Sequence, residues 1–112
     1  IHQQYAEAVE NIAGLTMVAV PGYADNNHWM NLLYIDRKTY REDREALMKR
    51  MEKNGIQTRP VWKLNHLQKP YKDCQNYCIE RAEILVTNSL CMPSSSNLTD
   101  ENLNHVITQL KA

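Results

Sequence analysis

The stretch Asn54–His66, NGIQTRPVWKLNH, decides the fold, and the rest of the chain is arranged around it. Asn54-Gly55 is typical of a helix end, because glycine accepts the left-handed conformation that a helix C-terminus often needs. Residues 56–61 then predict a short strand, in which Pro60 fixes its own φ and biases the residue before it toward extended backbone. The stretch therefore predicts a helix end, a strand and a loop in succession.

Four side chains suited to ligand binding fall within this stretch: Arg59, Trp62, Lys63 and His66. The arginine offers a planar fork of donors for phosphate or carboxylate, and the tryptophan a flat apolar face with one N–H donor. The lysine adds a point charge, and the histidine a donor or acceptor near neutral pH. This combination suits an anionic, partly planar ligand such as a nucleotide. Composition alone favours the alternative, a surface loop with a partly buried tryptophan.

Composition limits the class of protein. The 112 residues suffice for one domain with one core, and 13 basic residues balance 13 acidic ones. Zero net charge argues against electrostatic binding of nucleic acid or membrane, and no apolar run has the length of a membrane span. Three cysteines without a disulfide framework indicate a reducing, cytoplasmic setting. The chain begins at Ile1, inside an expected helix, which suggests a piece of something longer.

Apolar periodicity and turn residues predict an alternation of helices and strands. A helix is expected to open at Thr39, where Thr39 and Glu42 have the spacing of a capping box, and Thr99 is expected to cap a final helix. The other expected elements are helices over 2–13 and 73–86, a turn or a single helical turn at 67–71, and strands over 15–20, 28–36, 56–61 and 88–92. A small sheet covered by helices, an α/β chain of two layers, accounts for this order.

Other candidate chemistry is sparse. Cys74 and Cys78 lie four residues apart on an expected helix, but a zinc site needs a second pair of ligands, so buried free thiols are the favoured interpretation and no metal is expected. His28, beside Trp29, could line a cleft, although an edge position is favoured. Glycine-rich phosphate loops and serine elbows are absent, and no complete catalytic constellation is visible. The chain alone does not predict an enzyme.

The order of motifs resembles the C-terminal small domain of the DegT/StrS-type nucleotide-sugar aminotransferases. The resembling segments are HWMNLLYID (28–36), REDREALMKRMEKNGIQTRPVWKLNHLQKPY (41–71) and NSLCMPSSSNLTDENLNHVITQL (88–110). Within them, the family's pattern is matched by His28, Tyr34 and Ile35, by Gly55, Ile56, Thr58 and Arg59, by Pro60, Trp62 and His66, and by Pro93 with Leu98-Thr99. The likeness covers nearly the whole chain, and residues 1–13 resemble the end of the helix that links the two domains.

This resemblance implies an α+β two-layer fold with a small, mostly antiparallel sheet, as in the small domain of fold-type I pyridoxal phosphate enzymes. It implies that the Schiff-base lysine and the cofactor pocket lie upstream, so this chain would hold no catalytic residue, and its cofactor-binding residues stay unassigned. Arg59, Trp62 and His66 would face the substrate. Lys63 is adjacent to them, and Leu64 stands where many relatives have proline.

The implied function is transfer of an amino group from glutamate to a UDP- or GDP-linked keto-sugar, in a homodimer that serves surface polysaccharide biosynthesis. The cofactor would act as the electron sink and the protein would position it. Two alternatives stay open. One is a dehydratase of the same family, in which a histidine replaces the Schiff-base lysine, and the other is a non-enzymatic nucleotide-binding α/β module.

Overall fold

The computed structural model describes residues 1–112 and contains four α-helices and four strands. The helices are α1 (His2–Val9), α2 (Arg44–Lys53), α3 (Glu80–Asn88) and α4 (Asp100–Lys111). The strands are β1 (Leu15–Met17), β2 (Asn31–Ile35), β3 (Arg59–Pro60) and β4 (Ser89–Met92). Two 3-10 helices, η1 (Asn65–Leu67) and η2 (Lys69–Tyr71), follow β3. None of the helices combines the length and the apolar character needed to cross a membrane.

The four strands form one sheet in the order β1-β2-β4-β3, and each neighbouring pair is antiparallel. Leu33 at the centre of β2 pairs with Met17 on one side and with Leu90 on the other. Because side chains alternate between the faces of a strand, these paired residues share one face, and all three are buried. The expected fold class, an α+β two-layer fold with a mostly antiparallel sheet, is confirmed.

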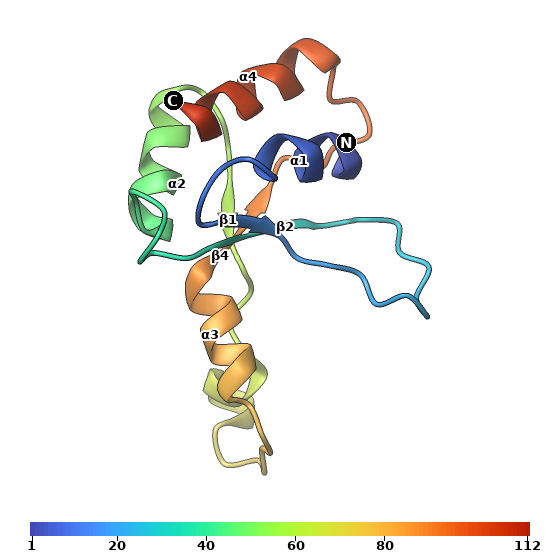
Figure 1. Ribbon diagram of the computed structural model, residues 1–112. Coiled ribbons are helices and arrows are strands. Elements are labelled where there is room, and N and C mark those ends of the chain that lie inside the picture. The colour runs from blue at the N-terminus through green and yellow to red at the C-terminus, as the bar shows by residue number, and fades with distance from the viewer.

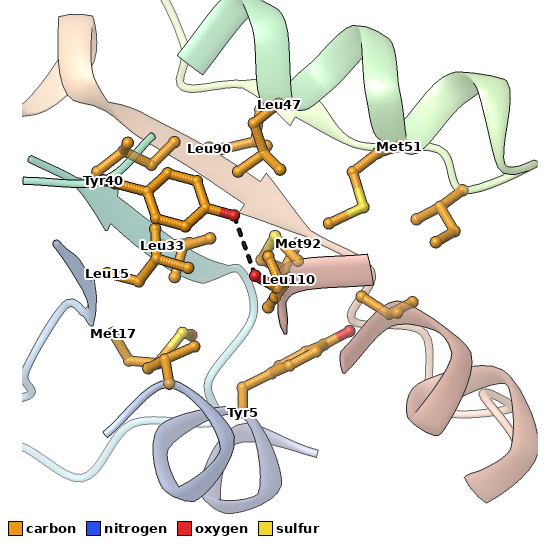
Figure 2. Close-up of a cluster of buried hydrophobic side chains, with 14 of the residues drawn as sticks. Tyr5, Leu15, Met17, Leu33, Tyr40, Leu47, Met51, Leu90, Met92 and Leu110 are labelled. Carbon is orange, nitrogen blue, oxygen red and sulfur yellow. Dashed lines mark hydrogen bonds between the residues drawn. The ribbon is translucent and has the colours of Figure 1, made fainter. Parts of the chain in front are cut away.

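The apolar core lies between this face of the sheet and the helices α1, α2 and α4, which Figure 1 shows together on one side. Figure 2 shows their side chains meeting those of the strands. Each helix contributes one stripe at helical spacing, and each fully buried aliphatic side chain contributes roughly 1.5–3 kcal/mol through removal from water. The buried helical residues are Tyr5 and Val9, Leu47 and Met51, and Leu103, Val106 and Leu110.

Two buried tyrosines bond to backbone carbonyls at the edge of this core. The Tyr5 hydroxyl donates to the Pro93 carbonyl at 3.0 Å. The Tyr40 hydroxyl donates to the Leu110 carbonyl at 3.0 Å (Figure 2) and accepts from Arg50 Nη2 at 3.1 Å. A buried hydroxyl without a partner would be costly, so these bonds allow tyrosine in the core. Burial also raises the pKa of the Tyr5 phenol above its ordinary value of 10.0.

Residues 61–88, here named the arm, project from the opposite side of the sheet (Figure 1). The arm contains η1, η2 and α3, and no residue of α3 is fully buried. Arg44 Nη1 donates to the Val86 carbonyl at 2.7 Å, which ties the end of α3 to the start of α2. The arm thus presents a largely exposed surface outside the main core.

The expected start and cap of the helix α2 are wrong. α2 begins at Arg44, and its cap is Asp43, whose carboxylate accepts from the Ala46 amide. Thr39 does not cap the helix, because its hydroxyl donates to Asp36 in the preceding turn at 2.8 Å. Glu42 instead pairs with the guanidinium of α2's Arg50 at 3.0 Å. By contrast, the Thr99 cap of α4 is confirmed, since its hydroxyl accepts from the Asn102 amide.

The other expected elements are present but mostly shorter. The first helix ends at Val9, and the expected strands over 15–20, 28–36 and 56–61 shrink to β1, β2 and β3, whereas 88–92 is close to β4.

The expected helix over 73–86 is wrong in its first half, since α3 begins only at Glu80. Residues 73–79 follow an irregular path, and Cys78 has a positive φ of 51°. Cys74 and Cys78 are exposed, which corrects the expectation of buried thiols, while Cys91 in β4 is buried.

Candidate functional site

The candidate site begins where β3 leaves the sheet. Arg59 pairs with Cys91 of β4, so the strand that precedes the loop is anchored on the core sheet. Beyond it, Gln68 Nε2 donates to the Lys63 carbonyl at 3.0 Å and to Asn65 Oδ1 at 3.3 Å. These bonds bridge η1 and hold the loop in a compact turn. The sequence thus places Trp62, Lys63 and His66 on a short, braced segment.

Three of the four predicted site residues line one cavity. Trp62, Lys63 and His66 border a space of about 460 Å³ between the loop and the start of α3. A volume of this size falls within the range of small-molecule sites, roughly 300–1,000 Å³. The remaining lining residues come from the arm, and they are Leu64, Asn65, Tyr71, Cys74, Gln75, Asn76, Ile79 and Ala82.

Arg59 is not part of this cavity. Its exposed side chain lines a separate space of about 490 Å³ beside the end of α2, together with Glu52, Gly55 and Gln57. The structure therefore does not bring all four predicted residues together. The reason is their place in the fold, because Arg59 still belongs to β3, whereas the other three residues lie beyond the end of that strand.

His66 is the most enclosed of the predicted residues, with a side chain that is only 15% exposed. Its Nε2 lies 3.4 Å from Glu83 Oε1 of α3. The geometry is not that of a hydrogen bond, and Nε2 has no other polar partner although it is buried. This nitrogen is shielded from solvent, and a buried polar atom without a bond is rare in proteins.

A second tryptophan, Trp29, lies beside the site, although it does not line the cavity. The Trp29 ring meets the Trp62 ring edge to face, with centroids 6.3 Å apart and planes at 70°. Trp29 lies in the long loop between β1 and β2, far from Trp62 in the sequence. A weak signal for Trp29 is visible in the sequence, namely the pair His28-Trp29 at the entry to an expected strand. His28 itself is half-buried and stacks on His2 at 3.9 Å.

Metal ligands do not gather in this structure. No group of three or more His, Cys, Asp or Glu side chains is placed to hold a metal ion. Cys74 lines the cavity, but no second ligand accompanies it there except His66. The arrangement is instead one of aromatic faces, one lysine and one imidazole, which suits a planar anionic organic ligand.

Comparison with known proteins decides the family. The model of the DegT/DnrJ/EryC1/StrS aminotransferase family matches residues 1–111. The chain belongs to this family. It is 26% identical over 114 residues to EpsN of Bacillus subtilis (strain 168), to which a pyridoxal phosphate-dependent aminotransferase activity is assigned by name. That match covers 98% of this chain and 29% of EpsN, so the chain spans less than a third of its relative.

Solved structures agree with the fold of this family member. The sugar-nucleotide enzyme DesI, solved in the presence of its TDP-sugar product, superposes with a TM-score of 0.84 and 22% identity. The aminotransferase TlmJ from Streptoalloteichus hindustanus superposes with a TM-score of 0.81 and 20% identity. Each match covers 98% of this chain and 28% or 29% of the solved chain. At these identities the likeness establishes the fold, that of the small domain of fold-type I aminotransferases.

The residues of this chain do not form a site for pyridoxal phosphate. All seven lysines are exposed, and Lys63 is the one that borders the arm's cavity. A Schiff-base lysine is normally desolvated or placed beside another cation, which lowers its pKa. None of the seven has the necessary burial, and no glycine-rich phosphate cradle exists among the three glycines. We therefore derive no chemical step through the cofactor from this chain.

Proposed function

We propose that residues 1–112 form the small domain of a pyridoxal phosphate-dependent sugar aminotransferase, with residues 1–13, which contain α1, as the end of the segment that joins it to a large domain. The observation that carries this proposal is the family match over the whole chain, together with Trp62, Lys63 and His66 around one cavity. The cofactor would be bound by the large domain and would supply the electron-sink chemistry.

In this proposal the arm forms one wall of the sugar-nucleotide site. Trp62 offers a face for the base or sugar, while Lys63 and His66 lie within the same cavity for the diphosphate. Arg59, three residues before Trp62, lines the separate space beside the end of α2 and would bind a phosphate that reaches beyond the cavity. The substrate is a UDP- or GDP-linked keto-sugar, and glutamate is the amino donor.

The arm's cavity is open to solvent, so it needs a second wall. A ligand pocket usually buries most of its ligand. The large domain, or a second subunit of a homodimer, would supply that wall and complete the site. We place the reaction in surface polysaccharide biosynthesis, in the cytoplasm, where three free cysteines stay reduced.

The test uses the whole polypeptide that carries these residues. Its absorbance is recorded with pyridoxal phosphate before and after borohydride, and the modified peptide is identified by mass. A reducible lysine adduct, followed by glutamate-dependent amination of UDP- or GDP-keto-sugars, is the expected result. Cofactor bound without a reducible adduct would replace the proposal by the dehydratase. Failure to bind cofactor would replace it by a nucleotide-binding module.

A further inference from the structure

Two tryptophans that are distant in the sequence meet on the surface of the molecule. Trp29 and Trp62 are 65% and 68% exposed, yet their rings are in edge-to-face contact at 6.3 Å. Tryptophan normally buries most of its large apolar area. Here both rings remain exposed to solvent although they touch, and their planes lie at 70° to each other. We name Trp29 and Trp62 the aromatic corner.

The loop that carries Trp29 is fixed by its own side chains. Asn26 Oδ1 accepts from the His28 amide at 2.7 Å, and Asn27 Oδ1 accepts from the Trp29 amide at 3.0 Å. The imidazole of His28 stacks on that of His2 in α1, with ring planes 16° apart. Consecutive side-chain to backbone bonds of this kind set a defined turn. The backbone at Trp29 is therefore positioned by contacts that do not involve the arm.

Trp62 connects the corner to the candidate site, because it also lines the arm's cavity beside Lys63 and His66. Lys63 follows Trp62 directly and borders the same cavity, whereas Arg59, three residues before Trp62, lines the neighbouring space beside the end of α2. A nucleoside diphosphate has the matching chemistry, with a planar base at one end and two negative phosphates at the other. Tryptophan faces stack on any base, and the cations attract the phosphates.

We infer that the aromatic corner binds the base of the nucleotide sugar and that Trp29, a residue of the loop between β1 and β2, contacts that base directly. This inference rests on the proposed function and names a further binding residue for it. The exposed corner is also compatible with a protein surface packed against it. The flanking charges favour the nucleotide, and the experiment below distinguishes the two.

The experiment measures binding to the whole polypeptide by calorimetry, with UDP, GDP and TDP as probes and inorganic pyrophosphate as a probe without a base. Trp29→Ala should weaken binding of at least one of the three nucleotides on the order of tenfold, as expected for loss of one stacking contact. It should leave pyrophosphate binding unchanged. Trp29→Phe should retain part of the affinity. The matched control is Tyr23→Ala, since Tyr23 lies in the same loop, is 93% exposed and should change neither ligand.

Three results would overturn the inference. Equal affinity of Trp29→Ala and parent for all three nucleotides, while His66→Ala loses affinity, would place the base elsewhere and leave the proposed function standing. Equal weakening of pyrophosphate and nucleotides, or a change in oligomeric state, would make Trp29 a packing residue. A parent protein that binds none of the three nucleotides would overturn the proposed function itself, and the inference with it.

Discussion

His66 and Glu83 face each other between η1 and α3, with His66 Nε2 lying 3.4 Å from Glu83 Oε1, yet no hydrogen bond joins them. The imidazole is 15% exposed and the carboxylate side chain 51% exposed. The ring is thus enclosed by the arm while its buried nitrogen has no partner. A buried polar atom in that state carries a desolvation cost.

Because His66 borders the arm's cavity, replacing it should affect substrate use. In the whole polypeptide, His66→Ala should raise the KM for the nucleotide sugar by roughly tenfold or more, the size expected for a lost bond to a charged group. Cofactor absorbance should be unchanged, because the proposed function assigns the cofactor site to the large domain. Glu83→Gln is the control and should change KM by less than about twofold, since the Glu83 side chain is half exposed and does not line the cavity. Loss of cofactor absorbance in His66→Ala would contradict the assignment.

Two glycines with positive φ provide a matched test of packing. Gly14 has a φ of 83°, and a Cβ there would lie 2.3 Å from the Tyr40 amide nitrogen. Gly55 has a φ of 73° but no atom within 4 Å of the same position. Gly55→Ala should cost only the left-handed backbone strain, about 1–2 kcal/mol. Gly14→Ala should cost several kcal/mol, because the Tyr40 backbone must also move.

The measurement is the free energy of unfolding of both variants by urea titration. An equal decrease in the free energy of unfolding of the two variants would mean that the backbone around Tyr40 moves at little cost. The close approach at Gly14 would then have no structural role.

The sequence predicted those parts of the fold in which local and tertiary signals agree. The apolar stripe and threonine cap of α4, and the paired strands around Leu33, could be found because each residue's local preference matches its place in the core. The cap of α2 could not be predicted from the sequence. Thr39 and Glu42 have the spacing of a capping box, but Asp36 and Arg50 compete for their side chains.

The same argument applies to the arm. Cys74 and Cys78 have helical spacing with Ala82 and Leu85. Residues 73–78 are exposed, however, so no tertiary packing stabilises a helix there. Trp62, Lys63 and His66 could be predicted as neighbours because they are close in the sequence. Trp29 could not, since its contact with Trp62 exists only after β2 pairs with β4 and β4 with β3.

Thiol reactivity should separate the three cysteines. Cys74 and Cys78 are exposed and should react rapidly with a disulfide reagent such as DTNB, giving two fast equivalents per chain. Cys91 is 5% exposed, and burial raises the pKa of its thiol, so it should react much more slowly. Urea should bring Cys91 to the fast rate. A third fast equivalent in the native protein would show that the edge formed by β3 and β4 opens readily, contrary to the structure.

Asp36 should contribute to stability in a way that depends on pH. Its carboxylate accepts from the Lys38 amide at 3.0 Å and from the Thr39 hydroxyl at 2.8 Å. These bonds lower its pKa from the ordinary value of 3.8. A lowered pKa stabilises the folded chain above the unfolded value and loses that contribution as pH falls through the folded value. Asp36→Asn should therefore be less stable than the parent near neutral pH, and the difference should shrink below about pH 4.

Urea unfolding of parent and variant at several pH values checks this expectation. Thr39→Val removes one of the two donors and should give a smaller difference that shrinks over the same range, because the Lys38 amide still bonds to the carboxylate. A difference that stays constant from neutral pH into the acid range would show that Asp36 acts through the shape of its turn, whatever its charge. Such a result would remove ionisation from the account of how the turn between β2 and α2 is stabilised.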